Sequence, residues 1–177
     1  AVDAAVATGF ALAVTYPQAG NIGGGGFMLV HLNKEGRTVA IDYREVAPRA
    51  ARRDMFLDKT GEVVPQRSQL THLASGVPGS VAGLLHALER YGRLDRATVM
   101  APAIELAERG FPVSFTLSNT LTSPWGQRLL ANPAAKSYLF RPDGSVYQPG
   151  EILRQPDLAW TLRQIAERGT AGFYEGP

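Results

Sequence analysis

Cysteine is absent from the 177-residue sequence. Disulfide bonds, thiolate nucleophiles and cysteine-ligated metals are therefore excluded from this stretch of chain. The net charge is small too, because 18 Lys and Arg residues are balanced by 16 Asp and Glu residues, which leaves a formal net charge of +2. The densest basic group is interrupted by two acidic residues and comprises Arg44, Arg49, Arg52 and Arg53. A nucleic-acid-binding face would gather basic residues without such interruptions, so nucleic acid is not an expected partner.

Long hydrophobic runs are also missing. The longest apolar stretch, residues 1–14, contains Asp3 and is shorter than the roughly 20 residues of a membrane-spanning helix. It has no charged leader either, so we expect no membrane or targeting signal in this chain. The 45% hydrophobic and 19% charged residues are typical of a folded domain. Residues 1–7 resemble the interior of a helix, and the sequence stops at Gly176 and Pro177. We therefore expect the sequence to be a piece of a longer polypeptide.

Hydrophobic spacing in the first quarter of the chain predicts a helix followed by a β-hairpin. Residues 1–15 are apolar nearly all round, which predicts a helix buried on most faces and ended by Pro17. The apolar run 27–30 predicts a buried strand. Residues 38–44 alternate between apolar and polar, so we expect them to form the second strand, with one face buried.

Further helices are predicted at residues 78–91 and 156–168, where helical spacing ends at a glycine. Pro102 is expected to divide residues 95–110 into two helices. A turn is predicted at residues 141–144, joining short strands around Leu139 and Val146.

Five glycines, at position 20 and positions 23–26, invite comparison with a phosphate-binding loop. Phosphate loops run strand, loop, helix, whereas the order expected here is helix, loop, strand. The GxGxxG spacing also fails, because Ile22, Met28 and Leu29 occupy required positions. We therefore interpret the glycines as allowing close backbone packing beside a buried strand, with a ligand-contacting backbone loop as the alternative.

The other candidate residues predict no metal, cofactor or serine site. His31, His72 and His86 are too far apart for a metal signature, and none has a carboxylate at ligand spacing. His86 lies off the apolar stripe of its helix, so we expect it in solvent. Ser75 lacks both flanking glycines of the G-x-S-x-G elbow.

Asp42 and Arg44 share the polar side of the second predicted strand, at its end. A guanidinium group offers a planar fork of donors suited to a carboxylate, so this strand end is a candidate site for an ionic ligand. The alternative is a solvated strand end with an internal Asp42–Arg44 ion pair. Composition alone leaves both interpretations open.

Longer motifs follow one another along nearly the whole chain. The three longest are PQAGNIGGGGF at residues 17–27, DYREVAP at 42–48 and SGVPGSVAG at 75–83. Shorter ones lie at residues 1–7, 91–92, 101–103, 109–111 and 172–174. In this order they resemble the γ-glutamyltransferase, or glutathione hydrolase, family, and they identify the chain as an internal piece of the large subunit.

The resemblance implies an α+β fold of the N-terminal-nucleophile (Ntn) hydrolase class, in which two stacked sheets lie between helix layers. Residues 1–177 would form part of that αββα sandwich, with no internal domain boundary expected. In such enzymes the precursor cuts itself, and the new N-terminal threonine of the small subunit attacks the γ-glutamyl amide of glutathione or a related compound. Water or an amino acid then resolves the acyl-enzyme.

This chain contains neither that threonine nor the cleavage motif, so we expect no catalytic residue in it. The expected partners are a small γ-glutamyl substrate and the small subunit of the same precursor, and the resemblance implies a periplasmic or secreted enzyme. The family's arginine that binds the donor α-carboxylate corresponds to Arg44, which favours the ligand interpretation of this residue. Two other functions remain open: a β-lactam side-chain (cephalosporin) acylase on the same scaffold, and a non-catalytic scaffold module.

Overall fold

The structure is a computed structural model that describes residues 1–176; Pro177, at the end where we expect a longer chain to continue, lies outside the described residues. Tertiary contacts divide the chain into two compact units. One, here called the helical unit, comprises residues 1–22 and the residues from 84 onward, and the other, the hairpin unit, comprises residues 23–83. The expectation that residues 1–177 are one part of a large subunit stays a prediction.

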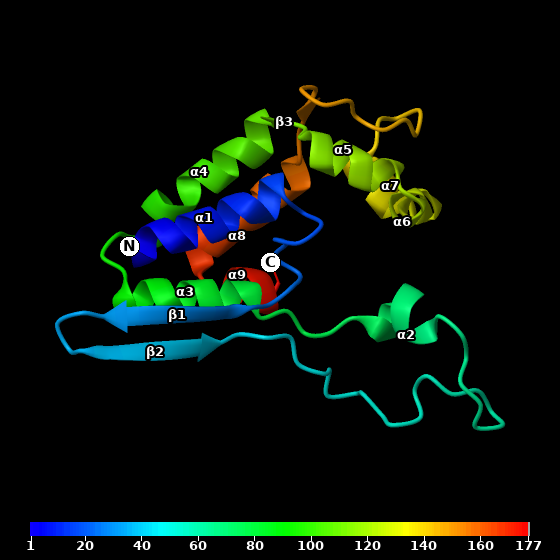
Figure 1. Ribbon diagram of the computed structural model, residues 1–177, viewed down its shortest axis with the longest axis horizontal. Coiled ribbons are helices and arrows are strands. Elements are labelled where there is room, and N and C mark those ends of the chain that lie inside the picture. The colour runs from blue at the N-terminus through cyan, green and yellow to red at the C-terminus, as the bar shows by residue number, and fades with distance from the viewer. Residues whose placement is uncertain (177) are drawn as a thin grey trace. The chain divides into compact units, whose positions relative to one another are not determined.

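Three long helices form the centre of the helical unit. Helix α4 (Arg96–Arg109) packs against both α1 (Val2–Thr15) and α8 (Pro156–Arg168), and Figure 1 shows the three side by side. The short α9 (Ala171–Tyr174) packs on α8. Fully buried side chains of the unit include Val6, Phe10, Leu85, Met100, Leu162 and Ile165. The predicted helix 156–168, with its glycine at the C-terminal end, is confirmed.

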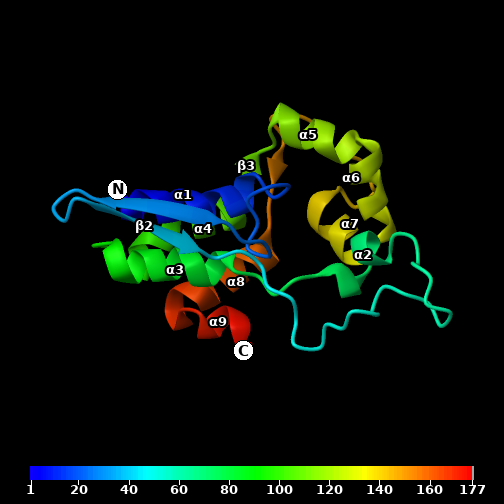
Figure 2. The same cartoon turned by 60° about the horizontal axis from the view of Figure 1, so that its bottom comes forward.

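The rest of the helical unit is built from short elements. Helix α3 (Ser80–Tyr91) begins in the hairpin unit and continues into the helical unit, which confirms the helix predicted over this stretch. Strands β3 (Phe111–Pro112) and β4 (Ile152–Leu153) form an antiparallel pair. Between them lie α5 (Phe115–Thr122), α6 (Pro124–Arg128), the 3₁₀ turn η2 (Leu129–Ala131) and α7 (Pro133–Leu139). The three α-helices are visible as a group in Figure 2.

Helix α1 forms as predicted, but it is not buried on most faces. Only Val6, Phe10, Ala13 and Val14 are buried, whereas the other side of the helix includes exposed alanines. The sequence is apolar all round, yet neighbours within this chain cover one stripe of it, and burial depends on those neighbours rather than on hydropathy alone. At its N-terminus the Asp3 carboxylate accepts hydrogen bonds from two main-chain N–H groups just after α3.

The predicted division at Pro102 is wrong, because α4 continues through it. Proline lacks the N–H that would bond to the carbonyl four residues earlier, which normally weakens a helix. Here Met100 and Ala103, on the inner face of the helix, are completely buried, while Ala101 and Pro102 between them are exposed. Packing of this continuous apolar stripe outweighs the loss of one hydrogen bond.

The turn predicted at residues 141–144 is confirmed, since the Gly144 N–H donates to the Arg141 carbonyl at 2.8 Å and Gly144 has a φ of 85°. The strands predicted on either side are wrong. Leu139 ends helix α7, and Val146 lies in an irregular segment. Asn132 caps α7 through its side chain, accepting from two main-chain N–H groups, and this cap selects a helix over a strand.

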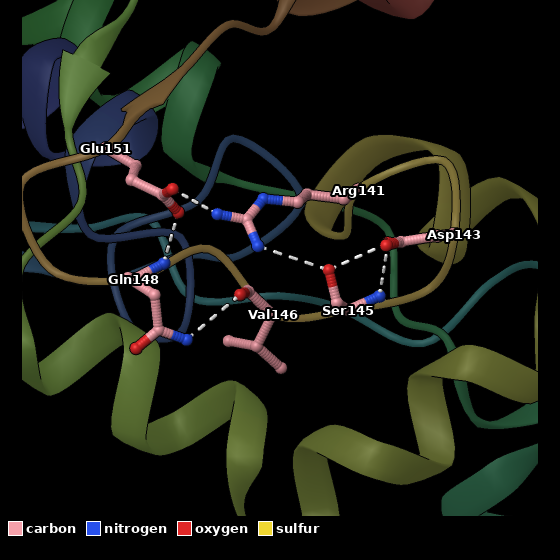
Figure 3. A network of polar contacts seen from close by, with 6 residues as sticks. All are labelled: Arg141, Asp143, Ser145, Val146, Gln148 and Glu151. Atoms are coloured by element: carbon pink, nitrogen blue, oxygen red, sulfur yellow. Dashed lines mark hydrogen bonds and ion pairs between the residues drawn. The ribbon is translucent and has the colours of Figure 1, made fainter.

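A polar network fixes the irregular segment that follows this turn (Figure 3). Arg141 pairs with the Glu151 carboxylate and donates to the Ser145 hydroxyl at 3.2 Å. Asp143 accepts from both the main chain and the hydroxyl of Ser145, and Glu151 accepts from the Gln148 N–H at 2.6 Å. The Gln148 hydrogen bond, with the Arg141 charge beside it, lowers the pKa of Glu151. The members satisfy one another, so we assign the network to loop structure.

Gln155 connects the end of α1 to the start of α8 and is completely buried. Its side-chain amide donates to the Val14 carbonyl at 2.8 Å, and its amide oxygen accepts from the Tyr138 hydroxyl. Burial, with the nearby Asp157 charge as a smaller contribution, raises the pKa of Tyr138 to about 12. The phenol therefore stays protonated and keeps donating throughout the neutral range.

The hairpin unit contains β1 (Phe27–Leu32) and β2 (Arg37–Asp42), which pair antiparallel with Phe27 opposite Asp42 and Val30 opposite Val39. The predicted hairpin and its alternation are confirmed, because Val39 and Ile41 are half-buried between exposed neighbours. The prediction that residues 27–30 are a fully buried strand is wrong. Its apolar residues alternate in direction, and one side of the strand is uncovered.

The remainder of this unit is mostly irregular. It contains the single-turn helix α2 (Arg67–Leu70), the 3₁₀ turn η1 (His72–Ala74) and two isolated β-bridges, Leu57–Val63 and Val46–Val77. Within residues 1–176, every helix is too short or too polar to cross a lipid bilayer.

Replacing Gln155 tests the buried connection. Gln155→Leu should lower the free energy of unfolding by about 1–3 kcal/mol, because it leaves the buried Val14 carbonyl and the part-buried Tyr138 hydroxyl without their partner. The measurement is denaturant unfolding of the full-length protein. The matched control is Gln69→Leu at an exposed position, which should change stability by less than about 0.5 kcal/mol. Equal effects of the two substitutions would contradict this role for Gln155.

The uncovered side of the hairpin predicts association of the isolated chain. Phe27 and Leu29 are 65% and 75% exposed on this side, beside strand edges that pair with nothing else in the described part of the chain. Such surfaces favour self-association. Sedimentation should therefore show oligomers or aggregates, and Leu29→Lys should reduce them.

His31→Lys adds the same charge on the same side of β1 without removing apolar area, so it should reduce association less. A compact monomeric wild-type chain with cooperative unfolding would show that residues 1–177 close their own core.

Candidate functional site

The candidate site lies in the hairpin unit, just beyond the end of β2. Pairing of the hairpin continues one residue past the strands, because the Tyr43 N–H donates to the Gly26 carbonyl at 3.0 Å and the Gly26 N–H donates back at 3.4 Å. Three residues later, Val46 and Val77 exchange main-chain hydrogen bonds at 2.8 and 3.3 Å. Arg44 therefore lies in a short segment whose backbone is anchored on both sides.

Arg44 projects from this segment with its side chain 69% exposed. Its Nε lies 3.4 Å from Oε2 of Glu45. The predicted alternative, an internal ion pair with Asp42, is not what the structure contains: Asp42 instead accepts the main-chain N–H of Arg44 at 3.0 Å. Among the described residues the contact with Glu45 is the one ion pair of Arg44, and its guanidinium makes no hydrogen bond.

The predicted glycine loop packs directly against this segment. A Cβ built on Gly25 would lie 2.6 Å from the Tyr43 carbonyl oxygen and 2.9 Å from Oε2 of Glu45. The Gly24 carbonyl accepts hydrogen bonds from the main chain of Gly79 and Ser80 at 2.8 and 3.0 Å. The close packing predicted for the glycines is confirmed at Gly20, Gly25 and Gly26, and the Gly24 hydrogen bonds join the loop to the start of α3.

Glycines at the start of α3 approach the same segment even more closely. A Cβ on Gly79 would lie 1.9 Å from the Tyr43 carbonyl oxygen, and a Cβ on Gly83 would lie 2.1 Å from Tyr43 Cγ. Partial burial raises the pKa of the Tyr43 phenol, so its ring packs as a neutral group. Sequence reasoning missed Gly79 and Gly83 as part of the site. Their spacing of four residues at the beginning of a helix, which puts both on one face, was the available signal.

The other candidate residues do not gather at this site. The three histidines are exposed, as expected for His86, and Nδ1 of His31 lies 3.1 Å from the Thr38 hydroxyl across the hairpin. Ser75 is exposed on an irregular segment after η1. In the part of the chain that the structure describes, no three His, Asp or Glu side chains are close enough together to hold a metal ion.

Comparison with known proteins gives one consistent result. The sequence model of the family described as Gamma-glutamyltranspeptidase matches residues 1–177. The Glutathione hydrolase proenzyme of Escherichia coli K12 is 49% identical over 99% of this chain, and the matched region is 30% of that relative's length. The chain thus spans about a third of such relatives.

Solved structures agree. The γ-glutamyltranspeptidase of Helicobacter pylori superposes with a TM-score of 0.95 at 49% identity, covering 99% of this chain and 50% of that one. A cephalosporin acylase from Bacillus halodurans superposes with a TM-score of 0.81 at 29% identity, covering 99% of this chain and 33% of that one.

These similarities confirm the predicted fold class. The helices and short sheets described above are part of an α+β fold of the Ntn-hydrolase class, shared with solved γ-glutamyltranspeptidases. The match of the family model over the whole sequence and the identity to the curated relatives lead to one assignment. This chain belongs to the γ-glutamyltranspeptidase family.

Proposed function

We propose that the protein containing these residues cleaves γ-glutamyl amide bonds, as in glutathione, and that Arg44 binds the α-carboxylate of the γ-glutamyl donor. A threonine hydroxyl outside this chain would add to the γ-carbonyl carbon, the C–N bond would break, and the amine would leave with a proton. Water or an amino acid would then attack the resulting ester and regenerate the hydroxyl. The small subunit cut from the same precursor would supply that threonine.

The observation that carries the proposal is the presentation of Arg44. Its backbone is anchored on both sides, while its side chain is largely exposed and its guanidinium makes no hydrogen bond among the described residues. A carboxylate binds best to two parallel N–H donors of a guanidinium. An anchored backbone with an available fork of donors is suited to binding an incoming carboxylate in a defined orientation.

Glu45 supports this orientation. Its carboxylate lies 3.4 Å from Nε, and the Arg44 side chain stays 69% exposed. The pair is exposed, so by itself it contributes little to stability, but it restricts the rotation of a long side chain. A restricted guanidinium loses less entropy when a ligand binds.

The acylase alternative is less well supported. Identity to the cephalosporin acylase is 29%, against 49% to the glutathione hydrolase and the γ-glutamyltranspeptidase compared above. The fold is common to both groups, so the preference rests on sequence identity. The non-catalytic scaffold function requires that the complete protein lack the threonine nucleophile. Hydrolytic activity of the complete protein would therefore exclude it.

The first functional prediction concerns the isolated chain of residues 1–177. It should release no p-nitroaniline from γ-glutamyl-p-nitroanilide above a blank, because the proposed nucleophile lies outside it. The full-length processed protein, measured in parallel, should hydrolyse this substrate. Activity of the isolated chain would show that the chemistry resides within these residues.

The second prediction tests Arg44 in the full-length enzyme. Arg44→Gln should lower kcat/KM for γ-glutamyl-p-nitroanilide by about tenfold to a hundredfold, because a charge-assisted hydrogen bond to a carboxylate contributes about 1.5–3 kcal/mol. Self-cleavage should be unaffected. Arg44→Lys should recover part of the loss, since an ammonium group cannot form the two parallel bonds.

The comparison substrate is the p-nitroanilide of 4-aminobutanoate, which lacks only the α-carboxylate. Arg44→Gln should affect this substrate little. The matched control is Arg37→Gln, because Arg37 is an exposed arginine of the same hairpin, paired with Glu35 at 2.6 Å. If wild type and Arg44→Gln distinguish the two anilides equally, Arg44 does not bind the α-carboxylate.

A further inference from the structure

The side chain of Tyr43 lies against two glycines at contact distances that no other residue would permit. A Cβ on Gly83 would lie 2.1 Å from Cγ and 2.3 Å from Cβ of Tyr43, and a Cβ on Gly79 would lie 1.9 Å from the Tyr43 carbonyl oxygen. Real Cβ atoms essentially never come closer than 3.0 Å to such atoms. The backbone of residue 43 can follow this path only because residues 79 and 83 are glycines, which carry a hydrogen atom where other residues carry a Cβ.

Rotating a side chain could not relieve these contacts. A Cβ on Gly79 would meet the Tyr43 main-chain carbonyl, and a Cβ on Gly83 would still lie 2.3 Å from Tyr43 Cβ, an atom that stays in place when the side chain rotates. The far end of the ring also lies close to Gly26, whose added Cβ would be 3.0 Å from Cε2. The ring thus contacts glycine at both ends, and Arg44 is the next residue along the chain.

We propose that Tyr43, Gly79 and Gly83 are positioning residues that set where Arg44 presents its guanidinium to the donor. The inference rests on the proposed function of Arg44. A Cβ at position 79 or 83 displaces the backbone of residue 43, and this displacement passes directly to Arg44. Misplacing a substrate-binding group by about 1 Å can lower the rate by about a hundredfold.

The same geometry makes the effect specific. Alanine is a better helix former than glycine, so Gly83→Ala would by itself favour helix α3. A loss of activity in this variant would therefore not come from weaker helix propensity, and we assign it to the contact with Tyr43. Tyr43→Ala acts in the opposite direction, since it removes the ring and leaves space next to Gly83. Both variants should weaken binding of the donor α-carboxylate by Arg44, one because it adds a Cβ against Tyr43 and the other because it removes the ring.

The experiment uses the full-length protein, processed, with both p-nitroanilides described above. Gly83→Ala and Tyr43→Ala should each lower kcat/KM about tenfold or more for the γ-glutamyl substrate, mainly through KM, and little for the 4-aminobutanoyl substrate. Tyr43→Phe keeps the ring contacts and should stay close to wild type. Gly9→Ala is the matched glycine control: it lies in helix α1, and its Cβ would meet only the end of the flexible Leu84 side chain, at 3.0 Å.

The outcomes separate this inference from the proposed function. Equal losses on both substrates, or failure of both variants to be processed, would assign Tyr43 and Gly83 to folding and overturn the inference. A second contradicting result is that Gly83→Ala and Tyr43→Ala keep the wild-type ratio of kcat/KM between the two substrates while Arg44→Gln loses that ratio. In that case the inference fails and the role of Arg44 stands. If Arg44→Gln itself distinguished them as wild type does, the proposed function would fail.

Discussion

Tyr43 passes so close to three glycines that no side chain fits at their positions: its main-chain carbonyl lies against Gly25 and Gly79, and the base of its side chain lies against Gly83. Everything described at the candidate site depends on this contact. It brings the glycine loop, the end of β2 and the first turn of α3 together within the hairpin unit, and hydrogen bonds from the Gly24 carbonyl hold the arrangement in place. Glycine is used here for the approach of one backbone to another, and the absence of a side chain is the functional property.

In this arrangement the backbone of Arg44 provides a fixed position, and its side chain provides donors for a ligand. The backbone around Arg44 is held by paired hydrogen bonds on either side, whereas its side chain remains exposed and lightly paired. A ligand-binding arginine needs both features, because a mobile backbone would lose orientation and a buried, fully paired guanidinium would have no donors left. The same division explains why acidic neighbours are tolerated: Asp42 accepts a main-chain N–H, and Glu45 lies 3.4 Å from Nε without a hydrogen bond to the guanidinium.

Much of the fold was predictable from local patterns. The hairpin and the helices ending at Tyr91 and Arg168 follow from periodicity and glycine position. The errors arose where tertiary contacts outweighed a local rule: a buried stripe carries α4 through Pro102, and an Asn132 cap makes a helix where a strand was expected. The exposed sides of α1 and β1 could not be foreseen, since hydropathy does not say which neighbours lie within the same stretch of chain.

The site was only partly predictable. An arginine and an aspartate on the polar side of a strand end suggested an ionic ligand, and family resemblance selected Arg44. The four-residue spacing of Gly79 and Gly83 placed both on one helix face but did not reveal their role, because that role is a distance to Tyr43, more than thirty positions earlier in the sequence.

The most direct test of the account is a crystal structure of the processed full-length enzyme with glutamate, the product of γ-glutamyl hydrolysis, bound. We expect both terminal nitrogens of Arg44 to lie about 2.7–2.9 Å from the α-carboxylate oxygens, in a bidentate pair. A bound glutamate whose α-carboxylate is held by other groups, with Arg44 still directed only at Glu45, would contradict it.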